Sequence, residues 1–127
     1  MNTKPRLLIV EDDLDNQKLL NMFLKRFYEV SICDSSDSFY KMVDGKIFDI
    51  IIMDISLNGQ KDGLQLTSEI RAHPKLRSIP IVALSAHAFQ KDKDNAYKAG
   101  VDLYLIKPTP VKYLLESLEK ILLKKTK

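Results

Sequence analysis

The sequence is poor in cysteine and histidine. Cys33 is the only cysteine, so no disulfide can form within the chain, and no His/Cys spacing around it indicates a zinc site. We interpret Cys33 as a small core residue. The two histidines, His73 and His87, lack the partner expected of a catalytic or zinc-binding pair, and His73, beside Pro74, is interpreted as a helix-end residue.

Long hydrophobic runs are also absent. The apolar runs are four to six residues long, too short to span a bilayer, and the N-terminal MNTKPR lacks the apolar stretch of a signal peptide. We therefore expect a cytoplasmic protein that does not interact with membranes. With 127 residues and 45% hydrophobic composition, the chain can bury one core but not two. This predicts a single domain over residues 1–127, with its core at about 6–123.

The net charge of +3 is unevenly distributed. Residues 107–127 hold six lysines and two glutamates, whereas residues 1–106 hold fourteen basic and fifteen acidic residues. The basic tail, residues 124–127, is interpreted as a solvated helix end. Because no aromatic platform or recognition motif accompanies it, we expect no direct contact with nucleic acid.

One stretch, FDIIIMDISL at residues 48–57, organises the rest. The four apolar residues Ile50–Met53 do not alternate with polar ones, which is typical of a strand buried on both faces of a parallel sheet. Asp54 ends this run, where ligands bind in open α/β sheets. The alternative for Asp54 is a helix N-cap or a turn residue.

The whole chain alternates between strand and helix patterns. Strands are predicted at residues 6–10, 29–33, 50–53, 79–84 and 102–106. Helices are predicted after Asp13, from the cluster 34–36 to Gly45, over 63–73, over 89–99 and from Thr109, with Thr109 as N-cap and Pro110 in the first helical position. This alternation predicts a doubly wound α/β sheet.

Two helices show a clear apolar face. The first predicted helix has a stripe formed by Leu20, Phe23, Leu24 and Phe27. The last has apolar residues at helical spacing: Val111, Leu114, Leu115, Leu118, Ile121 and Leu122. We expect both faces to pack on the sheet.

Polar residues follow four of the predicted strands. Right-handed crossovers bring the carboxyl ends of parallel strands to one edge, so this edge should gather Glu11 and Asp12, Asp54, Ser85, and Lys107. Carboxylates about 4 Å apart repel by on the order of 4 kcal/mol at an effective dielectric near 20. Mg²⁺ can neutralise them.

This set of residues suits phosphoryl transfer. Asp54 can act as a nucleophile toward phosphorus, giving an aspartyl phosphate. Lys107, the Ser85 hydroxyl and the metal would then stabilise the oxygens on which charge accumulates.

These motifs resemble the receiver domain of two-component response regulators. The resemblance covers residues 6–123 and rests on Val10-Glu11-Asp12, Met53-Asp54, Leu84-Ser85-Ala86 and Lys107-Pro108. It implies a flavodoxin-like (βα)5 sandwich whose five-stranded parallel sheet has the order 2-1-3-4-5. It also implies that the partner is a histidine kinase or a histidine phosphotransfer protein.

The resemblance also assigns site roles. It makes Asp54 the phosphoacceptor, with Asp12, Asp54 and the backbone carbonyl of Ser56 as direct Mg²⁺ ligands and Glu11 acting through water. Lys107-Pro108 matches a cis peptide bond of the family. One departure is that the family commonly has a proline four residues after the acceptor and a glycine eight after, whereas here Asn58 is fourth and Gly63 is ninth. The loop is one residue longer, beyond Ser56, so we expect the metal site to survive and the adjacent surface to be reshaped.

A switch is implied as well. Tyr104 matches the switch aromatic, the alternative being a half-exposed strand tyrosine. We expect Ser85 to move toward the phosphoryl group and Tyr104 to turn inward, changing a partner-binding face over residues 89–112 that could also serve a homodimer. As a hypothesis, Ser56 and His87 tune the phosphoryl lifetime; an exposed loop histidine is the alternative for His87.

Three other functions are weighed against this one. A Mg²⁺-dependent phosphatase with an aspartyl phosphate usually has an Asp-x-Asp pattern, but Ser56 occupies the second position. A receiver-like scaffold that is never phosphorylated is the second alternative. Flavin binding is the third alternative, but the chain has acidic residues after its first strand in place of a loop that could bind phosphate. The space after Leu123 is too short for an output domain, so we expect a non-enzymatic, stand-alone switch or relay protein, unless the chain is a fragment of a hybrid kinase.

Overall fold

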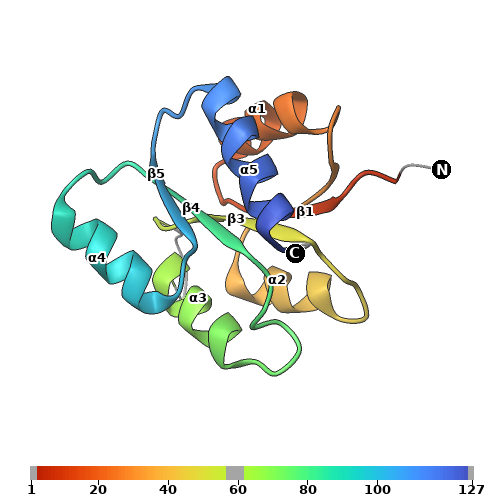
Figure 1. The fold of residues 1–127 in the computed structure, drawn as a ribbon. Helices are drawn as coiled ribbons and strands as arrows, with labels where there is room; N and C mark the ends of the chain where they lie inside the picture. The colour runs from red at the N-terminus through yellow and green to blue at the C-terminus, as the bar shows by residue number, and fades with distance from the viewer. Residues whose placement is uncertain (1–2, 57–61, 126–127) are drawn as a thin grey trace.

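The computed structural model describes residues 3–56 and 62–125, so Asn58 lies outside the described residues. Five parallel strands form one sheet in the order β2-β1-β3-β4-β5, which confirms the predicted flavodoxin-like fold (Figure 1). The strands are β1 (Arg6–Val10), β2 (Glu29–Cys33), β3 (Ile50–Asp54), β4 (Ile81–Ser85) and β5 (Leu103–Ile106).

Five helices cover the two faces of the sheet. They are α1 (Leu14–Leu24), α2 (Ser36–Val43), α3 (Gly63–Ala72), α4 (Gln90–Ala99) and α5 (Val111–Lys125). Helices α1 and α5 lie on one face, and α2, α3 and α4 lie on the other (Figure 1). Within residues 3–56 and 62–125, none of the helices combines the length and apolarity needed to cross a bilayer.

The core is divided by the sheet into two clusters. Alternate residues of a strand point to opposite faces, so Leu8 and Val10 pack with α2, α3 and α4, whereas Leu7 and Ile9 pack with α1 and α5. Every residue of β3 is buried, as its unbroken apolar sequence predicts. Cys33 is buried beside the first cluster, which confirms its interpretation as a core residue.

Side-chain caps fix the starts of three helices. Asp13 accepts from the N–H of Asn16 at α1, and Ser35 and Asp62 each form a capping box at α2 and α3. Helix α4 differs, because Phe89 precedes it and provides no side-chain cap. The first turn of α4 is therefore held less firmly than those of the other three.

The predicted stripe on α1 is only half correct. Leu24 is fully buried and Leu20 is partly buried, but Phe23 and Phe27 are 37% and 47% exposed. The helix ends at Leu24, so Phe27 is not on its face. Tyr28, which the pattern did not select, is buried in the core instead.

Two predicted element starts also differ. The prediction that β4 begins at Ile79 is wrong, although Ile79 and Pro80 are buried in front of the strand. The prediction that Thr109 is the N-cap of the last helix is wrong, because α5 begins at Val111 and Thr109 does not immediately precede it. The Thr109 hydroxyl donates to the carbonyl of Ile106 (2.8 Å). Pro110 lies just before α5 and accepts the N–H of Leu114 (3.0 Å), so the helix proper begins one residue later.

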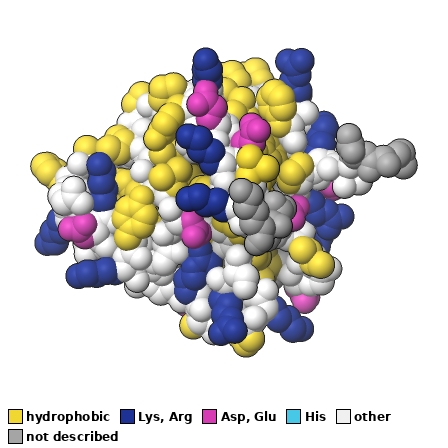
Figure 2. Space-filling model, in the orientation of Figure 1, with side chains coloured by type: hydrophobic (Ala, Val, Ile, Leu, Met, Phe, Trp, Pro, Cys, Tyr) yellow, Lys and Arg dark blue, Asp and Glu magenta, His cyan; other side chains and the backbone are white. Residues whose placement is uncertain are grey.

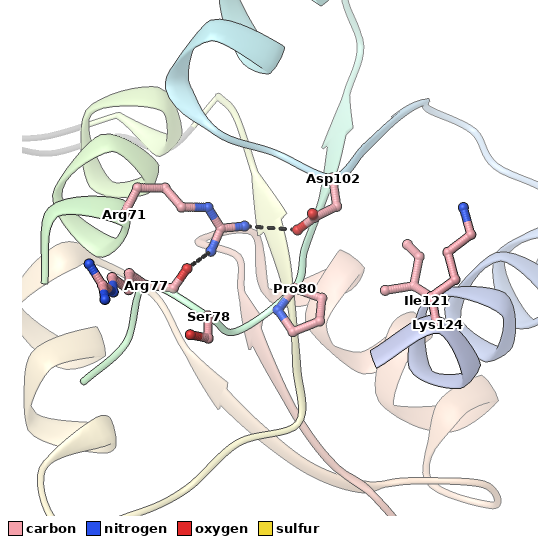
Figure 3. Close-up of a pocket in the computed structure, with 7 residues that line it drawn as sticks. All are labelled: Arg71, Arg77, Ser78, Pro80, Asp102, Ile121 and Lys124. Carbon is pink, nitrogen blue, oxygen red and sulfur yellow. Dashed lines mark hydrogen bonds and ion pairs between the residues drawn. The ribbon is translucent and has the colours of Figure 1, made fainter. Parts of the chain in front are cut away.

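A clamp built on Arg71 holds the end of the sheet where β4 and β5 begin. Its guanidinium donates to the carbonyls of Gly100, Arg77 and Ile79 and to the carboxylate of Asp102, all within 2.7–2.8 Å. In Figure 3 this guanidinium points at Asp102 and at the Arg77 carbonyl. A Cβ added at Gly100 would lie 2.5 Å from Arg71 Cγ, so only glycine permits this close packing.

Candidate functional site

The carboxyl ends of β1 and β3 bring acidic residues together. Glu11 and Asp12 follow β1, and Asp54 is the last residue of β3. The two strands are neighbours, with Val10 paired to Met53, so the residues that follow them lie side by side. Glu11 and Asp54 are only 1% and 4% exposed, although both carry carboxyl groups. Carboxylates buried this deeply require partners.

Lys107, the residue after β5, supplies one partner. Its ammonium lies 3.1 Å from Glu11 Oε1 and 3.5 Å from Asp54 Oδ1. The backbone N–H of Lys107 donates to the carbonyl of Ser85 (2.8 Å), which fixes the position of Lys107 against β4. The peptide bond between Lys107 and Pro108 is cis, as the sequence resemblance implies.

One ammonium does not neutralise the acidic cluster. Carboxylate oxygens of Glu11, Asp12 and Asp54 all lie within 4.8 Å of one another. Burial, then the hydrogen bond and negative charge of Asp54, raise the pKa of Glu11 to about 7, while Lys107 acts in the opposite direction. Burial lowers the pKa of Lys107, but its hydrogen bond to Glu11 and the charges of Asp54 and Glu11 outweigh this and raise the pKa overall. The cluster therefore favours an additional proton or cation.

The donor set suits Mg²⁺. This ion prefers oxygen ligands, uses one or two carboxylates and keeps several waters. Glu11, Asp12 and Asp54 provide such oxygens, and Asp12 is only partly buried, so one side of the cluster is open to solvent.

Ser56 and Gly63 shape the chain after β3. The N–H of Ser56 donates to Asp54 Oδ1 (2.9 Å), and the N–H of Gly63 donates to the carbonyl of Ile55 (3.3 Å). A Cβ at Gly63 would lie 2.3 Å from the carbonyl oxygen of Asp54. Helix α3 can therefore start against the end of β3 only because residue 63 is glycine.

Ser85, His87 and Tyr104 form a chain of hydrogen bonds. Ser85 is fully buried at the end of β4, and its hydroxyl oxygen accepts the N–H of His87 (3.1 Å). The carbonyl of His87 accepts the hydroxyl of Tyr104 (2.7 Å). The His87 side chain is exposed, whereas Tyr104 is 7% exposed and packs in the core beside α4. Tyr104 is thus already turned inward and is not the half-exposed tyrosine of the alternative interpretation.

The structure adds residues that the sequence patterns did not select. The side-chain amide of Gln17, on α1, donates to the carbonyl of Glu11 (2.6 Å), and the N–H of Asp13 donates to Glu11 Oε2 (3.3 Å). A hollow of about 330 Å³ lies beside Glu11 and Lys107, between α1 and the start of α5. The larger hollow at the Arg71 clamp, shown in Figure 3, lies where β4 and β5 begin, away from the acidic cluster.

A family comparison matches most of the chain. The model of the response regulator receiver domain matches residues 7–119. Among curated proteins, the chain is 35% identical over 116 residues to the sensor protein GacS of Pseudomonas syringae pv. syringae and 33% identical over 118 residues to the transcriptional regulatory protein ZraR of Salmonella typhimurium. It covers only 13% and 26% of those two proteins, which are much longer.

Solved structures agree with this match. A response regulator from Chloroflexus aurantiacus superposes with a TM-score of 0.89 and 30% identity, covering 94% of this chain and 98% of the other. The receiver domain of a sensor histidine kinase from Pseudomonas aeruginosa PAO1 superposes with a TM-score of 0.85 and 32% identity, at the same coverage. That structure has a magnesium ion coordinated in its active-site cleft.

Proposed function

The chain belongs to the response regulator receiver domain family, and from that premise we propose that it accepts a phosphoryl group on Asp54 from a phosphohistidine of a histidine kinase or histidine phosphotransfer protein. The observation that carries this proposal is the position of Lys107 Nζ, 3.5 Å from Asp54 Oδ1, beside a cluster of three carboxylates of which two are buried and one is partly buried.

In the proposed reaction, a carboxylate oxygen of Asp54 attacks phosphorus. The new O–P bond forms while the P–N bond to the donor histidine breaks, and the departing imidazole nitrogen keeps the electron pair and takes up a proton. Lys107 and the Ser85 hydroxyl stabilise the charge on the phosphoryl oxygens. The anchored backbone of Ser56 holds Asp54 in one orientation during the attack.

Mg²⁺ is the proposed cofactor. Asp12, Asp54 and the carbonyl of Ser56 would bind it directly, and Glu11 would bind it through water. When bound, it supplies positive charge to the transferring phosphoryl group and offsets the repulsion among the carboxylates.

Phosphorylation would act on the rest of the domain through Ser85. The hydroxyl oxygen of Ser85 accepts a hydrogen bond from the N–H of His87, and the carbonyl of His87 accepts one from the hydroxyl of Tyr104. Movement of Ser85 toward the phosphoryl group would act through this chain on the balance between inward and outward positions of Tyr104 beside α4. Because Tyr104 is inward in this structure, we expect phosphorylation to stabilise this arrangement rather than create it.

The proposed output surface is the face over residues 89–112. Three large hydrophobic residues on it are exposed by more than a third: Phe89 (78%), Tyr97 (47%) and Ile106 (36%). Aromatic side chains such as those of Phe89 and Tyr97 are enriched at protein interfaces, which supports a downstream protein target or a second copy of the chain as partner. Hydrophobic side chains also gather at the top of Figure 2, over α1 and α5. On α1, the side chains of Leu14, Leu19 and Met22 are exposed.

The mass of the intact protein tests the acceptor. After incubation with Mg²⁺ and acetyl phosphate, we expect the wild type and Asp37→Asn, an exposed control on α2, to gain one phosphoryl group. Asp54→Asn should gain none. A wild type that gains no mass would favour the scaffold alternative, and multiple turnover of a phosphate ester would favour the phosphatase.

The phosphoryl lifetime is proposed to depend on Ser56 and His87. Both side chains are exposed, and the backbone N–H groups of the two residues donate to Asp54 and to Ser85. We expect His87→Ala and Ser56→Ala to change the rate at which the phosphorylated protein loses phosphate; unchanged rates in both would dismiss this role.

A further inference from the structure

Gln17 connects the first helix to the acidic loop. Its side-chain Nε2 donates to the backbone carbonyl of Glu11 at 2.6 Å, across the turn between β1 and α1. Its backbone N–H donates to the carbonyl of Asp13 (2.9 Å), so Gln17 is fixed in the first turns of α1. One side chain thus ties the loop that carries the acidic residues to the rigid helix behind it.

This contact completes the restraint of Glu11. The N–H of Glu11 donates to the carbonyl of Cys33 (2.9 Å) on β2. Its carboxylate accepts from Lys107 Nζ (3.1 Å) and from the N–H of Asp13 (3.3 Å). Its carbonyl is held by Gln17. Backbone and side chain are therefore both fixed, from four different segments of the chain.

The carbonyl that Gln17 holds also affects the next residue. The carbonyl of Glu11 and the N–H of Asp12 belong to the same planar peptide unit. Fixing the direction of that carbonyl fixes the orientation of the plane and of the N–Cα bond of Asp12, which limits the directions that the Asp12 side chain can take. Asp12 shares the carboxylate cluster with Asp54, so its orientation decides whether the two carboxylates can bind one ion.

We propose that Gln17 is a positioning residue for the metal site, holding the peptide unit between Glu11 and Asp12 so that the Asp12 carboxylate faces Asp54. This rests on the proposed function, because it takes Mg²⁺ as the ion. Gln17 does not touch the ion or the phosphoryl group; it acts through the backbone. Partners that orient metal ligands in this way contribute strongly to affinity.

Gln17→Met tests the proposal, because methionine keeps the length and helix propensity but has no N–H to donate. The affinity for Mg²⁺ is measured by titrating ¹⁵N-labelled protein with the metal alone and following the amide shifts of residues 11–13. We expect the dissociation constant to rise about tenfold, at the lower end of the 10–100-fold range for residues that orient ligands. Gln17→Asn, whose amide is too short to reach the carbonyl, should shift it in the same direction.

Gln90→Met is the matched control. Gln90 also makes a side-chain hydrogen bond on a helix, to Asp94 (2.9 Å), but on α4. Its affinity for Mg²⁺ should equal that of the wild type. At saturating Mg²⁺, the phosphorylation rate of Gln17→Met with acetyl phosphate should return to near the wild-type rate, because the lost contact weakens metal binding and not the transfer itself.

The outcomes separate this inference from the function beneath it. A wild type that binds Mg²⁺ and gains a phosphoryl group, together with a Gln17→Met variant of equal affinity, overturns the role of Gln17 alone. A variant that loses stability to urea but keeps wild-type affinity also overturns it, since Gln17 would then only stabilise the fold. A wild type that neither binds Mg²⁺ nor gains mass overturns the proposed function itself.

Discussion

Lys107 Nζ lies closer to Glu11 Oε1, at 3.1 Å, than to Asp54 Oδ1, at 3.5 Å. The lysine is therefore shared between a carboxylate proposed to bind metal through water and the carboxylate proposed to accept the phosphoryl group. Its positive charge attracts phosphoryl oxygens but repels a nearby Mg²⁺. The two roles can be separated by removing the charge.

Lys107→Met should reduce the rate of phosphorylation by about 10²–10³-fold, the usual effect of removing one donor that stabilises transition-state charge. Mg²⁺ affinity should be unchanged or higher, because a repelling charge is gone. Rates with acetyl phosphate and an NMR titration with Mg²⁺ measure the two effects, and Lys112→Met, an exposed lysine of α5, is the control. Parallel losses of Mg²⁺ affinity and rate would contradict this account.

Gly63→Ala should disturb the site from the side of α3. The new Cβ would lie 2.3 Å from the carbonyl oxygen of Asp54 and 2.8 Å from the Cα of Ile55, so the backbone must move. We expect a loss of about 1–3 kcal/mol in the free energy of unfolding, as for other overpacked sites, and slower phosphorylation. Urea unfolding and the amide shifts of Asp54 and Ile55 measure this. Ser68→Ala, on the exposed side of the same helix, should change neither.

The strands and the site edge could be predicted because their signals are local. The run Ile50–Met53 has only one plausible environment, a strand buried on both faces, and parallel topology then places the residue after each strand at the same edge. That rule predicts, without any knowledge of contacts, that the edge gathers Glu11, Asp54, Ser85 and Lys107.

The sequence did not predict where the first helix ends, nor the contacts of Gln17 and Gly63, because these do not depend on a repeating hydrophobic pattern. The α1 stripe assumed that the helix continues to Phe27, but the chain turns after Leu24 and buries Tyr28 instead. The bond from Gln17 to the carbonyl of Glu11 joins a side chain to a backbone oxygen six residues earlier, which no hydrophobic pattern encodes. The close approach of Gly63 to Asp54 likewise depends on how α3 meets the sheet.

Tyr97→Phe should loosen α4 from the edge of the sheet. β5 is an edge strand, and the N–H of Tyr104 on its outer side donates to the Tyr97 hydroxyl (3.1 Å). Removing this hydroxyl should speed hydrogen exchange of the Tyr104 amide about fivefold, since a net hydrogen bond contributes about 1 kcal/mol. Tyr113→Phe, an exposed tyrosine of α5, should leave that exchange unchanged. Equal exchange rates in wild type and Tyr97→Phe would show that α4 is held by other contacts.

Cys33 should resist alkylation in the folded protein. The side chain is 5% exposed, and the pKa of its thiol is raised to about 12, mainly because of this burial. The thiolate is the reactive form, so iodoacetamide at pH 8 should label Cys33 only after unfolding in urea, as measured by the mass of the protein.

The raised pKa also makes the stability of the fold depend on pH. Below the pKa that the Cys33 thiol has in the unfolded chain, its stabilising contribution is fully present. This contribution is lost between about pH 9 and 12, so the stability of the wild type relative to Cys33→Ala should fall in that window. Rapid labelling of Cys33 without urea would contradict the burial on which both predictions rest.

Arg71→Lys should weaken the fold without changing the chemistry. Arg71 donates to three carbonyls and to Asp102, a fork geometry that a lysine ammonium cannot reproduce. Hydrogen bonds to a charged group contribute about 1.5–3 kcal/mol each, so a loss of about 2 kcal/mol or more in the free energy of unfolding is expected. Arg77→Lys, at an exposed residue that lines the same hollow, should change the free energy of unfolding little.

The Arg71 clamp lies where β4 and β5 begin, whereas the carboxylates lie where β1 and β3 end. Mg²⁺ affinity and phosphorylation should therefore stay at wild-type levels under conditions in which Arg71→Lys is folded. A fall in Mg²⁺ affinity in the folded variant would mean that the two ends of the sheet are coupled.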